Sequence, residues 1–144
     1  MKRWLAQALF FCLPIVAFGA ESPEAVRRKA ERGDAEAQFN LGVLYRNERG
    51  DSAEGAKWHR KAAEQGFALA QLHLGVMYVE GDGVPKDEIE AYAYFNLAAV
   101  SLSAAKSFRE ILEKQFSRNE ILAGQRRTKE LQMELEAKRK SAGK

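Results

Sequence analysis

Apolar residues recur every three or four positions through most of the chain beyond residue 33, which is the spacing of one face of an α-helix. No stretch alternates apolar and polar residues in the way that a half-buried β-strand does. The pattern therefore predicts an all-α fold.

Residues suited to helix ends divide this pattern into segments. Asp34 and Asp51 or Ser52 are candidate N-caps, and Gly81 provides a stop. Two further starts resemble capping boxes, in which a Ser or Asp precedes a Glu by three residues. These ends predict a short helix from Ser22, helices over about 34–47, 51–66, 68–80 and 87–100, and a long polar helix after residue 117.

The chain repeats itself. Residues 33–45 and 66–78 match at 8 of 13 positions. The match resumes after a connecting loop that is three residues longer in the second unit, where Trp58 aligns with Tyr94 and the pair Ala62-Ala63 with Ala98-Ala99. A period in this range with helical signals in both halves predicts paired helices stacked side by side.

Small and aromatic residues at the repeated positions are expected to pack the helices together. A glycine inside a helix costs about 1 kcal/mol relative to alanine, so Gly42 and Gly75 are explained if neighbouring helices cross closely there. The predicted packing residues are Leu41, Gly42, Tyr45, Trp58, Ala62, Ala63, Leu74, Gly75, Tyr78, Tyr94, Ala98 and Ala99.

The two units resemble the Sel-1-like repeat, a relative of the tetratricopeptide repeat. The resemblance rests on Ala-Gln, Leu-Gly and Tyr in each first helix and on Ala-Ala in each second helix. It also rests on Gly81-Asp82-Gly83-Val84 in the loop between the two helices of the second unit. It covers residues 33–99 and implies a short α/α solenoid that binds a protein or peptide as an adaptor or scaffold. Phe67 departs from the pattern because the first unit has Asp34 there.

A largely polar strip runs along each first helix, and the resemblance makes it the candidate contact surface, since first helices line the concave face in repeats of this type. An ordinary solvated face is the alternative interpretation. We expect His73 to be a surface polar residue within it. The strip residues are Glu36, Asn40, Val43 and Asn47 in the first unit and Leu69, His73, Val76 and Glu80 in the second.

The long last helix carries a narrow stripe of Ile121, Gly124, Thr128, Leu131 and Leu135. We expect this stripe to cap the exposed edge of the second unit. Homodimerisation or docking of another helix through the stripe is the alternative. Caps or a dimer are needed because two units are few for a repeat array.

Residues 1–19 have the layout of a secretory signal peptide: Lys2 and Arg3, an apolar stretch from Trp4 to Phe18, and small residues around a predicted cleavage after Gly19. The apolar stretch is too short for a transmembrane anchor, and Cys12, the only cysteine, lies within it. We therefore expect a periplasmic or secreted protein without disulfides.

Charge is uneven along the chain. The net charge is +3, and the segment from Arg126 to Lys144 holds seven basic and three acidic residues. A basic tail can attract anionic surfaces, so an envelope-surface tether is an alternative function. Solvation of a fraying helix end is the simpler interpretation.

The sequence offers no recognised catalytic motif. It has no Gly-x-Ser-x-Gly, His-Glu-x-x-His or glycine-rich phosphate loop, and His59 and His73 lie in different helices without a metal-site pattern. We predict no catalytic residues, metal, cofactor or nucleic-acid partner. A cell-wall or β-lactam-related hydrolase of the repeat family remains the enzymatic alternative.

These predictions divide the chain into six parts. They are a signal peptide (1–19), an N-terminal helix (22–32), a first repeat (33–65), a second repeat (66–101), C-terminal capping helices (102–138) and a disordered basic tail (139–144).

Overall fold

The computed structural model describes residues 21–143, and within them the regular secondary structure consists of α-helices alone. The helices are α2 (Pro23–Glu31), α3 (Ala35–Asn47), α4 (Ser52–Glu64), α5 (Ala68–Glu80), α6 (Glu88–Ala98), α7 (Ser103–Glu113) and α8 (Arg118–Ala142). The all-α prediction is confirmed. The predicted signal peptide and its cleavage site lie outside the described residues.

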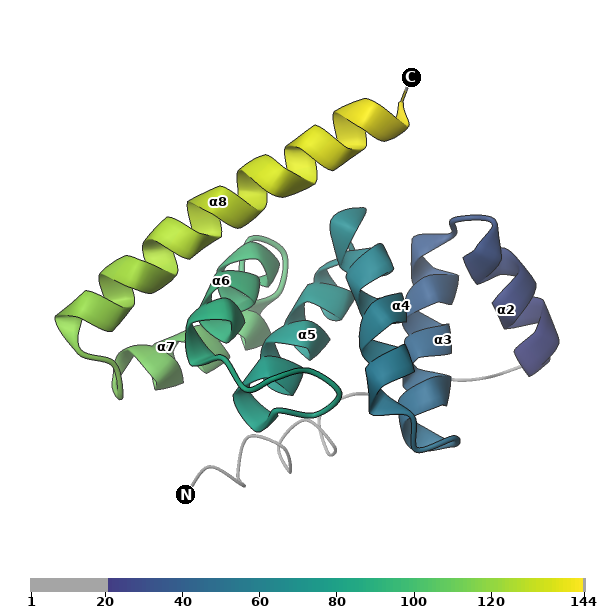
Figure 1. Cartoon of the computed structure of the whole chain (residues 1–144), viewed down its shortest axis with the longest axis horizontal. Helices are drawn as coiled ribbons and strands as arrows, with labels where there is room; N and C mark the ends of the chain where they lie inside the picture. The colour runs from purple at the N-terminus through teal and green to yellow at the C-terminus, as the bar shows by residue number, and fades with distance from the viewer. Residues whose placement is uncertain (1–20, 144) are drawn as a thin grey trace.

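The helices from α2 to α6 stack in chain order, each packing against the next (Figure 1). α7 contacts α6, and the long α8 then runs back across α6 and reaches α4 (Figure 1). The arrangement is a short α/α solenoid with a helix laid across it. The central buried cluster joins α3 to α6 with Leu131 and Leu135 of α8, a second cluster joins α5, α6 and α7, and a third joins α2 with α3 and α4.

The helix starts follow the capping residues of the sequence. The side chains of Ser22, Asp34, Asp51, Asp87 and Ser117 each accept a backbone hydrogen bond from the first turn of the helix that follows. Ser117 and Glu120 form the full capping box. Phe67 provides no side-chain bond at the start of α5, so this start depends on packing instead of capping.

The repeated glycines mark tight contacts, as predicted. A methyl group on Gly75 would lie 2.4 Å from the Phe95 ring, and one on Gly42 would lie 2.7 Å from the His59 ring. A third glycine of this kind, Gly124 of α8, would lie 2.4 Å from Tyr92. In each case an aromatic ring from the neighbouring helix rests directly on the glycine backbone, which leaves no room for a side chain.

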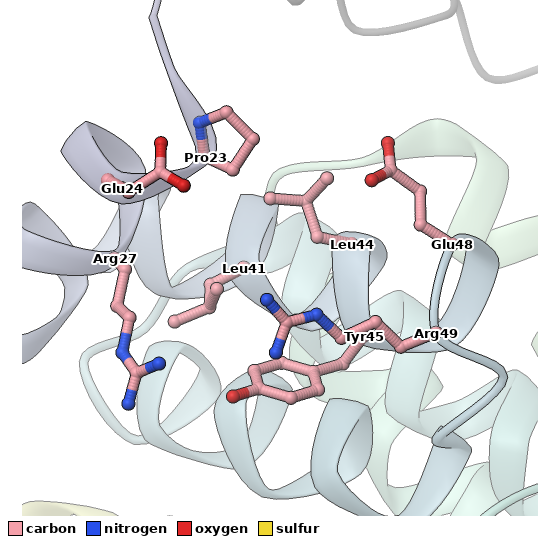
Figure 2. Close-up of a pocket in the computed structure, with 8 residues that line it drawn as sticks. All are labelled: Pro23, Glu24, Arg27, Leu41, Leu44, Tyr45, Glu48 and Arg49. Atoms are coloured by element: carbon pink, nitrogen blue, oxygen red, sulfur yellow. The ribbon is translucent and has the colours of Figure 1, made fainter.

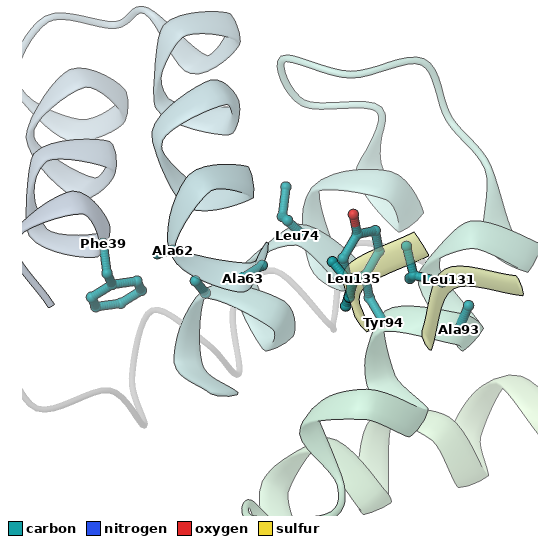
Figure 3. Packing of buried hydrophobic residues seen from close by; sticks show 9 residues of the cluster. Phe39, Ala62, Ala63, Leu74, Ala93, Tyr94, Leu131 and Leu135 are labelled. Carbon is teal, nitrogen blue, oxygen red and sulfur yellow. The ribbon is translucent and has the colours of Figure 1, made fainter. Parts of the chain in front are cut away.

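Most of the predicted packing residues are buried. Ala62, Ala63, Leu74 and Ala98 are fully enclosed, and Figure 3 shows several of them beside Phe39, Leu131 and Leu135. Tyr45, Tyr78 and Ala99 remain partly accessible and pack against the edges of the buried clusters.

α2 packs as the second helix of a repeat does. Gln38 of α3 donates a hydrogen bond to the Ala30 carbonyl of α2, and Gln71 of α5 donates the same bond to the Ala63 carbonyl of α4. α2 thus packs on α3 as α4 packs on α5. The solenoid therefore extends half a unit before residue 33.

α8 extends further than the sequence suggested. It remains helical through Ala142, within the segment 139–144 that was predicted to be a disordered tail. Arg139 donates a hydrogen bond to the Glu64 carbonyl, and Lys138 pairs with the Glu64 carboxylate at 2.5 Å. These contacts with the end of α4 hold the last turns in helical form, so the prediction of disorder is wrong for residues 139–142.

The stripe predicted on the last helix faces the solenoid. Leu131 and Leu135 are buried, Gly124 lies against Tyr92, and Thr128 accepts a hydrogen bond from Asn96. The stripe therefore covers the second repeat, as expected of a cap. No helix among residues 21–143 is both long enough and apolar enough to cross a membrane.

Candidate interaction surface

The predicted strip on α3 is open to a partner. Glu36 and Asn47 are exposed, and Asn40 and Val43 between them are partly exposed. These four residues occur every three or four positions, so their side chains lie along one face of α3. We call these four residues the α3 strip.

The corresponding strip on α5 is largely closed. Val76 is 3% exposed within a cluster that includes Phe95 of α6 and Leu112 of α7. Leu69 and Glu80 at the two ends are partly exposed. Since neighbouring helices cover its middle, the α5 strip does not form a continuous contact surface, and Val76, which was predicted to contact a partner, is buried.

The expectation that His73 is a surface residue is also wrong. Its ring is packed against Phe39 of α3 and His59 of α4, with ring centroids 4.9 and 5.1 Å apart. The side chain is only 9% exposed. The helical pattern placed His73 on the polar side of α5, but that side faces the junction with the first repeat.

Glu80 is held by an ion pair between the repeats. Arg46 of α3 lies 3.3 Å from Glu80 and 2.7 Å from Asp82 in the loop after α5. Burial raises the pKa of Glu80, whereas the Arg46 cation acts in the opposite direction. This carboxylate is therefore engaged in joining the two repeats.

A pocket lies between α2 and the second half of α3 (Figure 2). Pro23, Leu41, Leu44 and Tyr45 give it apolar walls, and the guanidinium carbon of Arg49 lies 4.8 Å from the centre of the Tyr45 ring. Three charged side chains, Glu24, Arg27 and Glu48, complete its lining. We call these eight residues the edge pocket.

The edge pocket was missed because it depends on differences between the two units. Between α5 and α6 the longer loop folds back, bringing Gly83 against the backbone of Ser52 at the start of α4. The loop after α3 is three residues shorter, and α2 begins at Pro23, which aligns with Ala56 inside α4. The length difference between the loops was the available signal for an opening here.

The described residues offer little for catalysis or metal binding. They hold no group of three or more His, Cys, Asp or Glu side chains arranged to bind a metal ion. His59 is fully buried with neither ring nitrogen hydrogen-bonded, and Nε2 of His73 also lacks a partner. Neither imidazole is therefore positioned by a hydrogen bond in the way that a general base is.

Comparison with known families decides the assignment. The Sel1 repeat model matches residues 35–67 and 68–99. The chain contains two Sel1 repeats. The matched segments correspond closely to the α3–α4 and α5–α6 pairs, so the repeats seen in sequence are the structural units of the solenoid. Proteins built from Sel1 repeats are generally protein-interaction scaffolds, and their fold is typically non-catalytic.

Two solved structures have a similar fold. One is a protective antigen of uropathogenic Escherichia coli strains with an SLR fold, which is 30% identical over 90% of this chain with a TM-score of 0.73. The other is a Sel1 repeat protein from Oxalobacter formigenes, 37% identical over 62% of this chain with a TM-score of 0.57. The chain spans 28% and 27% of these proteins, respectively. A search of curated proteins gave no match.

Proposed function

We propose that this Sel1-like repeat protein is an exported adaptor that binds a protein partner through the α3 strip and the adjoining edge pocket. The observation that carries the proposal is the difference in burial between the two first helices. α3 leaves Glu36, Asn40, Val43 and Asn47 accessible, whereas the corresponding middle of α5 is covered.

The chemistry of this surface suits a peptide segment of mixed character. Asn40 and Asn47 offer amide donors and acceptors, which can pair with the backbone of a bound segment. The apolar walls of the edge pocket can take an aliphatic or aromatic side chain, and its charged lining can pair with polar neighbours of that side chain. Export to the periplasm or beyond is part of the proposal and rests on the amino-terminal sequence pattern.

The tether alternative is less well supported by the fold. Lys138 and Arg139, two of the basic residues in the tail, are already engaged with Glu64 of α4. The side chains of Arg126, Lys129 and Lys140 remain exposed along the same helix. A vesicle containing anionic lipids would test the tether, since binding that persists in a chain ending at Gln125 excludes the tail as its cause.

Capture of partners from envelope extracts with surface variants as controls tests the adaptor function. The strip variant carries Asn40→Lys and Val43→Lys, the pocket variant carries Leu44→Lys, and the control carries Met133→Lys on the outer face of α8, where the side chain is 70% exposed. We expect a partner that binds the native chain and the control but not the strip variant.

The pocket variant separates the two halves of the proposed surface. A circular dichroism spectrum equal to that of the native chain must accompany each binding result, because Leu44 is buried. A partner retained by both the strip and the pocket variants binds elsewhere and would overturn the proposed surface.

A further inference from the structure

Three aromatic rings meet where the two repeats join. Phe39 of α3, His59 of α4 and His73 of α5 have ring centroids 4.9 to 5.2 Å apart in all three pairs. His59 is fully buried and His73 is 9% exposed. Both ring nitrogens of His59 and Nε2 of His73 lack a hydrogen-bond partner. The junction thus encloses two titratable groups without the partners that buried polar groups usually have.

The corresponding contact inside the second repeat has no titratable ring. His59 rests on Gly42 of α3, and at the aligned position in the second repeat Phe95 of α6 rests on Gly75 of α5. Two rings of similar shape therefore fill the same kind of space. Packing alone is satisfied by phenylalanine, so packing does not account for imidazole at the junction.

The surroundings of the two histidines disfavour a proton. Burial lowers the pKa of His59 well below its ordinary value, and His73 and Arg46 lower it further. Burial also lowers the pKa of His73 to about 4, with a contribution from Arg46. Arg46 comes from α3, while Glu80 of α5 and Asp82 of the following loop bind that cation. Protonation would thus place a second cation near Arg46 in an apolar enclosure.

We propose that His59 and His73 form an acid-sensitive joint, in which protonation of either ring loosens the packing of α3 and α4 of the first repeat against α5 of the second. Because Phe39 immediately precedes Asn40, loosening also disturbs the α3 strip. This proposal is based on the packing of the three rings and does not depend on the proposed adaptor function.

The direction of the pH effect follows from the two states. An unfolded imidazole takes up a proton near pH 6.5, whereas these rings in the closed joint do not until a lower pH. Stability from the neutral rings is therefore full above about pH 6.5 and is lost as the pH falls toward about 4. Between pH 7.5 and 5, His73, with a pKa of about 4, should lower the ratio of closed to open joint about 30-fold. His59 should lower this ratio in the same direction.

Equilibrium urea unfolding at pH 7.5 and 5 tests the joint with a substitution that the chain itself suggests. His59→Phe places at the junction the residue that the second repeat carries, and it should reduce the pH effect on the unfolding constant. His73→Asn, which matches Asn40 at the aligned position of the first repeat, should reduce this effect about 30-fold. It serves as a second variant in case His59→Phe does not fold. A pH effect unchanged in the variant that folds would overturn the proposal.

Nuclear magnetic resonance titration gives an independent measurement, because the chain has only two histidines. Both imidazole signals should remain those of neutral rings at pH 5.5 while the chain is folded. Titration of both rings near pH 6.5 without structural change would show that the joint is not closed to protons, and the proposal would fail.

Amide hydrogen exchange can show which helices become less protected when the histidines are protonated. At pH 5, amides in α4 and α5 of the native chain should exchange faster than those of His59→Phe at the same pH, while amides of α7 and the first half of α8 should match. Equal acceleration in all helices would indicate general acid unfolding and would contradict a joint between the repeats.

Discussion

The two Sel1 repeats share a packing scheme but differ in what surrounds them. In both, an aromatic ring rests on a helix glycine, and a glutamine of the first helix bonds to the helix before it. The second repeat is covered by α7 and α8, and its longer loop reaches back to the start of α4. Among residues 21–143, the helix beside α3 on the outer side of the first repeat is the short α2, which leaves an open strip and a pocket.

This difference indicates that the repeat motif determines the fold of a unit, whereas its neighbours determine how much of the surface of the unit stays accessible. Leu41 and Leu74 occupy aligned positions and both are buried, but Leu74 lies in the central cluster, whereas Leu41 lies in the cluster shared with α2 and also lines the edge pocket. The proposed function thus assigns recognition to the first unit and the more enclosed packing to the second. Substitutions at aligned positions can test that division.

The largest difference is expected for the aligned leucines. Leu74→Ala should destabilise the chain by about 3–4 kcal/mol, because Leu74 is fully buried and its neighbours cannot collapse into the space. Leu41→Ala should cost about 2 kcal/mol because Leu41 borders the open edge pocket. Equilibrium urea unfolding measures both. Met133→Ala, at an exposed position, is the control and should change stability by less than about 0.5 kcal/mol.

The aligned glycines come next. Gly75→Ala should cost about 2 kcal/mol and Gly42→Ala about 1 kcal/mol, because the new methyl group would meet Phe95 at 2.4 Å and His59 at 2.7 Å. Without these rings, alanine would instead stabilise each helix by about 1 kcal/mol. A gain in the unfolding midpoint for either variant would contradict the close ring contact.

The ion pair between the repeats should contribute less. Arg46→Gln should cost about 1–2 kcal/mol at pH 7, since it leaves the half-buried Glu80 without its cation. Arg46 opposes the rise in the pKa of Glu80 caused by burial, so its removal lets that pKa rise further.

A carboxyl group whose pKa is raised in the folded state stabilises that state more at low pH than at high pH. The difference in unfolding free energy between the native chain and Arg46→Gln should therefore become smaller toward pH 4. Removing the Arg46 charge also raises the pKa of His59 and His73, which reduces the loss of stability of the variant in acid. Unfolding of both proteins at each pH gives the comparison, and a deficit that widens with acid would exclude this account.

The smallest expected effects are at the helix starts. Asp34→Ala should cost about 1 kcal/mol by removing the N-cap of α3. Phe67→Asp would supply the missing cap of α5, but it also removes a ring that lies 5.4 Å from Phe39. We expect no net gain in thermal stability for this variant. A clear rise in melting temperature would show that the contact with Phe39 contributes little.

The fold was accessible from sequence because its determinants are local. Apolar spacing, capping residues and the repeated glycines specify α3 to α6, and each of these signals acts within a few residues. The start of α7 was less evident because Leu102 provides no capping side chain. The role of α2 was missed because the matching hydrogen bonds involve a backbone carbonyl, which the residue types do not reveal.

The candidate site was only partly accessible, because it depends on which helices lie beside each face. Helical spacing correctly grouped Glu36, Asn40, Val43 and Asn47 on the less buried face of α3. The same reasoning placed His73 and Val76 on an open face of α5, although other helices cover both. Burial of this kind depends on contacts between distant segments, which periodicity along a single helix does not report.

The length of α8 lets one helix support two repeats. The helix contacts Tyr92 of α6 at Gly124 and the end of α4 at Lys138, a distance along its axis of about 21 Å at 1.5 Å per residue. This length matches the spacing of the second helices of two adjacent repeats. A version lacking one of these two units would leave the final turns of α8 without the contacts at Glu64.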